Sequence, residues 1–272
     1  MRKIILLISF LLLLLGVDIV LPRVYPLISK YNYLLGFEAY TNAAGETFGE
    51  DRIILMGGSS LGWGVSAEKL TNSLGITTLN AGIHAGMGYK NIFRTIKPSI
   101  NKSKDILIVS PEYSMVSAHE ASERSREFCV ITIYLNENYP FNCVGFSINS
   151  LISLVPMLDK ILDFAAGGEY KRSGFNIFGD YTFRSSDKNM IGRFGSEDIC
   201  NNWDLEDLTN KYIPFLKELV LEGYEIVYIP NFIPEGICSD TKKIHTFHKI
   251  LFDHFGILSF DQPQLFFNQK YF

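Results

Sequence analysis

The sequence shows no excess of positive charge. Its 25 lysine and arginine residues stand against 29 aspartate and glutamate residues, which gives a formal net charge of -4. A protein that binds nucleic acid through its phosphates needs a basic surface, so nucleic acid is not expected as a partner. With 47% hydrophobic residues over 272 positions, the chain can bury a substantial core, as one large domain or as one domain with an insertion.

The N-terminus lacks a recognisable cleavage site for a signal peptidase. Residues 4–21 form an apolar stretch that Ser9, Gly16 and Asp18 interrupt. As a helix it would be about 27 Å long, nearly the thickness of a bilayer core. No A-x-A pattern follows, and no cysteine precedes Cys129, so neither a cleaved signal peptide nor a lipoprotein is indicated. We predict an uncleaved membrane anchor over residues 1–24, with a buried core helix as the alternative.

The charges on either side of the apolar stretch indicate on which side of the membrane the rest of the chain lies, and this bears on the state of the cysteines. Arg2 and Lys3 favour a cytoplasmic N-terminus, although Arg23 and Lys30 reduce the asymmetry. We therefore expect the rest of the chain outside the cytoplasm. The chain has only four cysteines, which in that compartment allow two disulfides in three pairings or remain as free buried thiols. They are Cys129, Cys143, Cys200 and Cys238.

The organisation of the chain favours an α/β fold. Residues 25–50 lack sustained periodicity and are predicted to be a juxtamembrane segment, followed by a folded domain over residues 51–272. Short apolar runs with β-branched residues predict buried strands: residues 52–56, 75–80, 105–110, 224–230 and 256–260. Helical periodicity falls between them: residues 65–74, 89–100, 207–223 and 240–256. This alternation predicts a parallel sheet with helices on its faces.

Residues 111–210 break the alternation of strands and helices. They are rich in asparagine, serine, glycine and aromatic residues, and they hold one helical pattern, at residues 150–165. We predict an insertion at the edge of the sheet, whose aromatic residues would suit the faces of sugars.

Two cofactor motifs are missing. No Gly-Lys-Ser/Thr follows Gly57 or Gly82, so the sequence has no P-loop. Gly82, Gly86 and Gly88 match a dinucleotide-binding spacing, but they follow the second predicted strand and the chain has no Tyr-x-x-x-Lys pair. No cofactor is therefore predicted.

The stretch GGSSLGWG, residues 57–64, directly follows the first predicted strand. A serine on such a strand-to-helix turn can expose its hydroxyl, while backbone N–H groups of the turn stabilise a developing oxyanion. Leu61 takes the place of the second glycine of the G-x-S-x-G elbow, so the stretch is not that of an α/β-hydrolase. The expected nucleophile is Ser59.

The same stretch resembles the Gly-Asp-Ser block of the SGNH (GDSL-type) hydrolase superfamily, in the Gly-Gly-Ser-Ser variety of membrane-anchored members. A second block of that superfamily is similar to residues 80–86, NAGIHAG. The resemblance implies a three-layer α/β sandwich with a five-stranded parallel sheet of flavodoxin-like type. It also implies Ser59 as the nucleophile, with the Ser59 and Gly86 N–H groups as oxyanion donors. Gly58 stands where the superfamily has aspartate.

Around these catalytic residues we expect four substrate-binding residues: Gly58, Asn80, His84 and Glu112. Glu112 lies in SPEYS, where the superfamily places Gly-x-Asn-Asp. A carboxylate cannot donate to an oxyanion unless it is protonated, so that donor is missing. A salt bridge at the edge of the sheet is the alternative for Glu112.

No aspartate or glutamate is followed three residues later by a histidine, so the Asp-x-x-His block that supplies the superfamily's general base is absent. If the resemblance holds, we expect either a chain truncated before that block or a degenerate member. His84 is a possible substitute base. His245 and His248, with Cys238, could be zinc ligands. A simpler interpretation is that the two histidines lie on the surface of a helix, so no metal is predicted.

The resemblance implies a serine esterase or O-acyltransferase that acts through an acyl-serine. For an anchored enzyme outside the cytoplasm, an acylated cell-envelope glycan is the expected substrate. The alternative is a non-catalytic envelope protein that keeps the fold for binding or assembly.

Overall fold

The computed structural model of the chain describes the following residues: 5, 8–10, 12, 34–82, 88–112, 115–116, 174–182, 204–230, 233–234, 241–255 and 266–267. Most of the apolar stretch at residues 4–21, the helical pattern at residues 150–165 and all four cysteines lie outside these positions. Within the described part of the chain, no helix is long and apolar enough to span a membrane.

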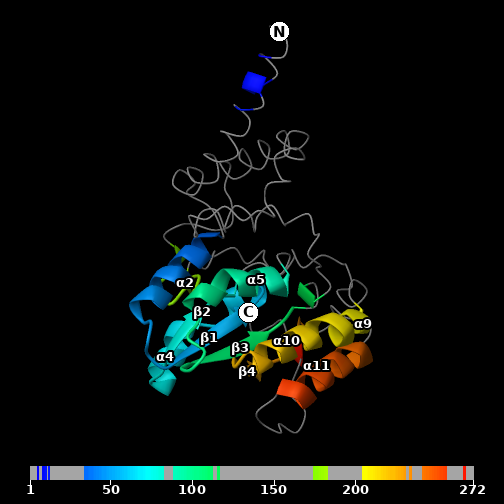
Figure 1. The fold of residues 1–272 in the computed structure, drawn as a ribbon. Helices are drawn as coiled ribbons and strands as arrows, with labels where there is room; N and C mark the ends of the chain where they lie inside the picture. Colours follow the sequence, from blue (N-terminus) through cyan, green and yellow to red (C-terminus); the bar gives the residue numbers. More distant parts are fainter. Residues whose placement is uncertain are drawn as a thin grey trace.

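The centre of the fold is a parallel sheet of four described strands (Figure 1). They are β1 (Arg52–Gly57), β2 (Thr77–Asn80), β3 (Asp105–Ser110) and β4 (Glu225–Tyr228). Their order is β2-β1-β3-β4, so the two central strands are β1 and β3. β2, β3 and β4 fall within apolar runs that the sequence predicts, and β1 extends one residue beyond its run. The prediction of a parallel α/β sheet is confirmed. The fifth predicted strand, at residues 256–260, lies outside the described residues.

Helices cover both faces of the sheet because the strand side chains alternate between them. Ile54 and Met56 of β1 face one core, to which four helices contribute: α2 (Leu34–Glu46), α5 (Tyr89–Ile96), α10 (Ile213–Leu221) and α11 (Thr241–Phe255). Ile53 and Leu55 face a smaller core, with α3 (Ser59–Gly64) and α4 (Ala67–Leu74). In Figure 1, α2 and α5 lie above the strands and α4 lies below them.

The remaining described elements are short. A 3-10 turn, η2 (Lys97–Ser99), follows α5, and α9 (Leu205–Asp207) with the π-helical η6 (Leu208–Tyr212) leads into α10. A separate parallel pair joins β5 (Ile233–Pro234) to β6 (Phe266–Phe267).

Helix α4 shows how local sequence sets the ends of the helices. The Ser66 side chain accepts a hydrogen bond from the Lys69 N–H at the N-terminus, and Gly75 adopts the left-handed conformation, φ 68°, at the C-terminus. These are the preferred residue types for the two ends of a helix. Gly223 has φ 93° and follows α10 in the same manner, as its place in the sequence predicts.

Helix α2 alters the expected start of the folded part. The sequence predicts a juxtamembrane segment over residues 25–50, but Tyr40, Ala43 and Ala44 of α2 are buried in the larger core. The packed structure therefore begins before Asp51. The apolar side chains of α2 are too weakly periodic to reveal this, because two of the three buried ones are alanines.

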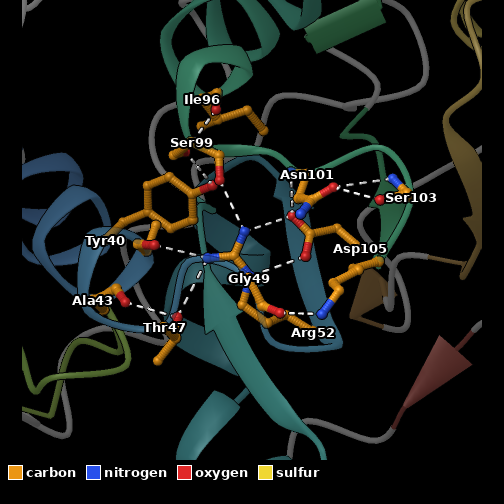
Figure 2. A network of polar contacts seen from close by, with 12 residues as sticks. Tyr40, Ala43, Thr47, Gly49, Arg52, Ile96, Ser99, Asn101, Ser103 and Asp105 are labelled. Carbon is orange, nitrogen blue, oxygen red and sulfur yellow. Dashed lines mark hydrogen bonds and ion pairs between the residues drawn. The ribbon is translucent and has the colours of Figure 1, made fainter.

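A buried ion pair joins the amino ends of β1 and β3 (Figure 2). The Arg52 guanidinium donates from Nε to Asp105 Oδ1 at 2.9 Å and from Nη2 to Asp105 Oδ2 at 2.6 Å. Its other N–H groups reach the backbone oxygens of Ala44 at 2.8 Å and Ser99 at 2.9 Å. These contacts tie α2 and the turn before β3 to the sheet, at the end opposite to the glycine-rich turn.

Candidate active site

Ser59 lies on a strand-to-helix turn, as the sequence predicts. Strand β1 ends at Gly57, Gly58 has extended backbone geometry with φ -87° and ψ -162°, and α3 begins at Ser59. The Ser59 side chain is half-buried, whereas Ser60 is exposed. Because ligand sites of open α/β sheets lie outside the carboxyl ends of the strands, Ser59 is where a nucleophile is expected.

The glycines in the turns after β1 and β2 allow close packing of the backbone. A Cβ atom on Gly57 would lie 2.5 Å from the Ser110 backbone oxygen, and one on Gly82 would lie 2.5 Å from the Gly62 backbone nitrogen. Helix α3 therefore packs directly against the turn after β2, and Leu61 fills the small core beneath it. Only glycine leaves enough space for these contacts.

Glu112 is the polar side chain brought to Ser59. Its Oε1 accepts a hydrogen bond from the Ser60 N–H at 2.6 Å and a longer one from Ser59 Oγ at 3.4 Å. The strand register explains the approach, since Gly57 of β1 pairs with Ser110 of β3. Ser59 and Glu112 each follow that pair by two residues, so both enter the same space beyond the sheet.

The surroundings of Glu112 contain no counter-charge in the part of the chain that the structure describes. The hydrogen bonds that its carboxylate accepts there come from the two serines, so the salt bridge considered as the alternative role of Glu112 is not found among the described residues. Burial raises the pKa of the half-buried Glu112 carboxyl above its usual value, and hydrogen bonds from Ser60 and Ser59 partly oppose that rise.

The Asn80 side chain is buried and connects the end of α3 with the turn that follows β2. Its Oδ1 accepts from the Gly82 N–H at 2.9 Å, and its Nδ2 donates to the Val65 backbone oxygen at 3.1 Å. Nδ2 also donates to Asp180 Oδ1 at 3.1 Å. The sequence predicts a substrate-binding residue here, whereas these contacts make Asn80 a residue that positions the turns. The other predicted residues of this block, His84 and Gly86, lie outside the described residues.

Asp180 is a supporting residue that the sequence does not reveal. It comes from the predicted insertion, and its buried carboxylate accepts hydrogen bonds from the Ala67 N–H at 2.7 Å and the Glu68 N–H at 2.9 Å. These are free N–H groups of the first turn of α4, where a negative charge is stabilising. The helical pattern at residues 65–74 predicts α4, but no local signal connects its first turn to a residue more than 100 positions later.

The segment around Asp180 also fits the backbone of β2 closely. The Asn80 N–H donates to the Phe178 backbone oxygen at 2.8 Å. Gly179 has φ 81°, and a Cβ atom there would lie 2.5 Å from the Asn80 backbone oxygen. Residues 174–182 thus hold the end of β2 and the start of α4 in place, close to the turn that carries Ser59.

His248 does not lie on a helix surface, which corrects the sequence interpretation. It is buried in α11, and its Nδ1 is hydrogen-bonded to the Tyr228 hydroxyl, whereas His245 is exposed. Burial, together with a smaller effect of the nearby His245, lowers the pKa of His248 to about 3. Among the described residues, no group of three or more metal-ligating side chains could hold a metal ion.

The geometry brings together a serine hydroxyl, a carboxylate that has no counter-charge among the described residues, and the backbone N–H groups of a tight turn. A hydroxyl beside an acceptor is the arrangement from which a serine nucleophile is activated. Of the six predicted site residues, the structure brings Gly58, Ser59 and Glu112 together, and it assigns Asn80 to support. The chain matches no protein-family profile, no curated protein and no solved structure.

Proposed function

We propose that this protein is a serine esterase or O-acyltransferase of the SGNH type that acts through an acyl-serine on Ser59. The observation that carries the proposal is the Ser59 hydroxyl at the carboxyl end of a central parallel strand, within hydrogen-bond reach of Glu112. In this proposal residues 256–260 form a fifth parallel strand beside β4, in a flavodoxin-like sheet. The N–H groups of Ser59 and Gly86 bind the oxyanion, and Gly58 and His84 contact the substrate.

The reaction is ester cleavage or acyl transfer in two steps. Ser59 Oγ bonds to the acyl carbon and the alcohol leaves, which forms an acyl-serine. Water then releases the acid, or a second hydroxyl group accepts the acyl group. The backbone N–H groups contribute by stabilising the negative charge that develops on the carbonyl oxygen.

The substrate class rests on the N-terminal sequence. The apolar stretch at residues 4–21 favours a membrane anchor, and the charges beside it favour a domain outside the cytoplasm. An enzyme placed there meets acylated glycans of the cell envelope, which carry the ester bonds that this chemistry cleaves or forms.

A direct test uses the full chain in detergent with p-nitrophenyl acetate. Wild type should release nitrophenol, and Ser59→Ala should abolish release above the uncatalysed rate. Ser73→Ala is the matched control, because Ser73 is an exposed serine on α4. Equal rates for wild type and Ser59→Ala would refute the enzymatic proposal and favour a binding or assembly protein with this fold.

A further inference from the structure

We propose that Glu112 is the general base that accepts the proton of Ser59. This inference rests on the proposed function and adds the residue that the sequence leaves unassigned. Its basis is the β1–β3 register, which sets the two side chains facing each other two residues beyond the Gly57–Ser110 pair.

The contact geometry suits a base that is held in place before reaction. The Ser60 N–H binds Glu112 Oε1 at 2.6 Å and so fixes the carboxylate, while Ser59 Oγ lies 3.4 Å from the same oxygen. The second distance exceeds that of a strong O–H···O bond. Catalytic hydrogen bonds are often long without substrate and shorten when the substrate binds.

The charge environment distinguishes the half-buried Glu112 from the two buried acids of the described residues. Asp105 is paired with Arg52, and Asp180 is bound to the first turn of α4. In the described part of the chain, Arg52 of β1 and Asp105 of β3 lie at the opposite end of the sheet, and α3 has no charged residue. The hydrogen bonds to the Glu112 carboxylate from this part of the chain come from Ser59 and Ser60. Burial therefore raises the carboxyl pKa toward the working pH, as an effective general base requires.

The proton balance closes with Glu112 alone. As Ser59 Oγ bonds to the acyl carbon, its proton moves to the carboxylate and the carbonyl electron pair moves to oxygen. When the ester C–O bond breaks, the leaving alkoxide takes the proton from Glu112 and departs as an alcohol. The attacking water or acceptor hydroxyl repeats both transfers, which restores the Ser59 hydroxyl and the ionised carboxylate.

If Glu112 acted as a hydrogen-bond donor instead of a base, the activity would depend on pH in the opposite way. A protonated Glu112 that donated to the oxyanion would be active below its pKa, so activity would fall as the pH rises. A general base is active above its pKa, so activity should rise. A residue that only positions the turn would be replaced by glutamine without loss, because the amide oxygen still accepts from the Ser60 N–H.

The test measures two rates on the full chain in detergent between pH 4 and pH 8. The first is kcat/KM with p-nitrophenyl acetate, and the second is labelling of Ser59 by a fluorophosphonate, located by mass spectrometry. Glu112→Gln should lower both by about 10²–10⁴-fold at pH 7, mainly through kcat, and should remove the rise with pH. Glu112→Asp should retain the rise at a reduced rate. Glu218→Gln, which changes an exposed glutamate, should match wild type.

Each outcome separates the two proposals. If Ser59→Ala is inactive but Glu112→Gln stays within about threefold of wild type, the inference fails and the proposed function stands. Wild-type rates that fall with pH also overturn the inference. If Ser59 is not labelled in wild type, both fail. If Glu112→Gln does not fold, the pH profile of the wild-type activity and that of Glu112→Asp test the inference instead.

Discussion

Arg52 and Asp105 form a buried bidentate ion pair at the first rung of the β1–β3 ladder, with 2.6 Å between Nη2 and Oδ2. The same register continues five rungs further to Gly57 and Ser110. An interaction at the amino end of the sheet thus helps to define the alignment that brings Ser59 to Glu112 at the carboxyl end.

Removing one partner of this pair should be strongly destabilising. We expect Arg52→Met to lower the free energy of unfolding by about 3–5 kcal/mol, because it leaves the Asp105 charge buried without a cationic partner. The double variant Arg52→Met/Asp105→Leu should lose less than Arg52→Met alone. Denaturant titration measures these differences.

The control for this prediction is the exposed pair of Lys249 and Asp253. Asp253→Ala should change the free energy of unfolding by about 0.5 kcal/mol or less, as expected for a solvated pair on a helix. A similar loss at both sites would contradict the importance assigned to the buried pair.

Glu112→Gln should stabilise the protein at neutral pH. The pKa of the Glu112 carboxyl is raised by burial, so the folded state binds this proton more tightly than the unfolded state. The resulting stability is present below the unfolded pKa of 4.5 and is lost as the pH rises through the folded pKa.

Neutral glutamine avoids that loss. The variant should therefore exceed wild type in free energy of unfolding at pH 7.5, and the difference should shrink at pH 4. Denaturant titrations at both pH values provide the measurement. A variant that is less stable than wild type by the same amount at both values would show that the carboxylate charge has no such cost.

His248 should make the fold sensitive to mild acid. Its pKa is about 3 in the folded protein, against 6.5 for the unfolded reference. Stability is therefore full above pH 6.5 and is lost as the pH falls toward 3, by about 2 kcal/mol at pH 5. His248→Gln should flatten this pH dependence in thermal or denaturant unfolding. The exposed His245 is the matched position, and His245→Gln should largely preserve the slope.

Gly62→Ala should disturb the Ser59 turn, because a Cβ atom at this position would collide with the Gly82 backbone oxygen. We expect a loss of about 1–3 kcal/mol in stability and slower labelling of Ser59. Gly64→Ala, in the same helix, is the control, since its Cβ atom would meet no atom within 4 Å. Unchanged labelling in Gly62→Ala would mean that the turn tolerates displacement of α3.

Local patterns were sufficient for most of the elements that build the sheet and its covering helices. The apolar runs predicted β1 and β3, and helical periodicity predicted α4 and α10. Helix α2 was missed because alanine contributes little to a hydrophobic pattern, although Ala43 and Ala44 lie in the core. His248 was misassigned because spacing identifies which residues share a helical face but not which face packs against the sheet.

By itself, the sequence determined the strand-to-helix turn that carries Ser59, since an apolar run followed by glycines and serines specifies that turn locally. Only the tertiary structure decided what stands beside it. Glu112 reaches Ser59 through the pairing of β1 with β3, and Asp180 reaches α4 from a distant segment. Such contacts depend on strand register and packing over 50 to more than 100 residues, which no short pattern encodes.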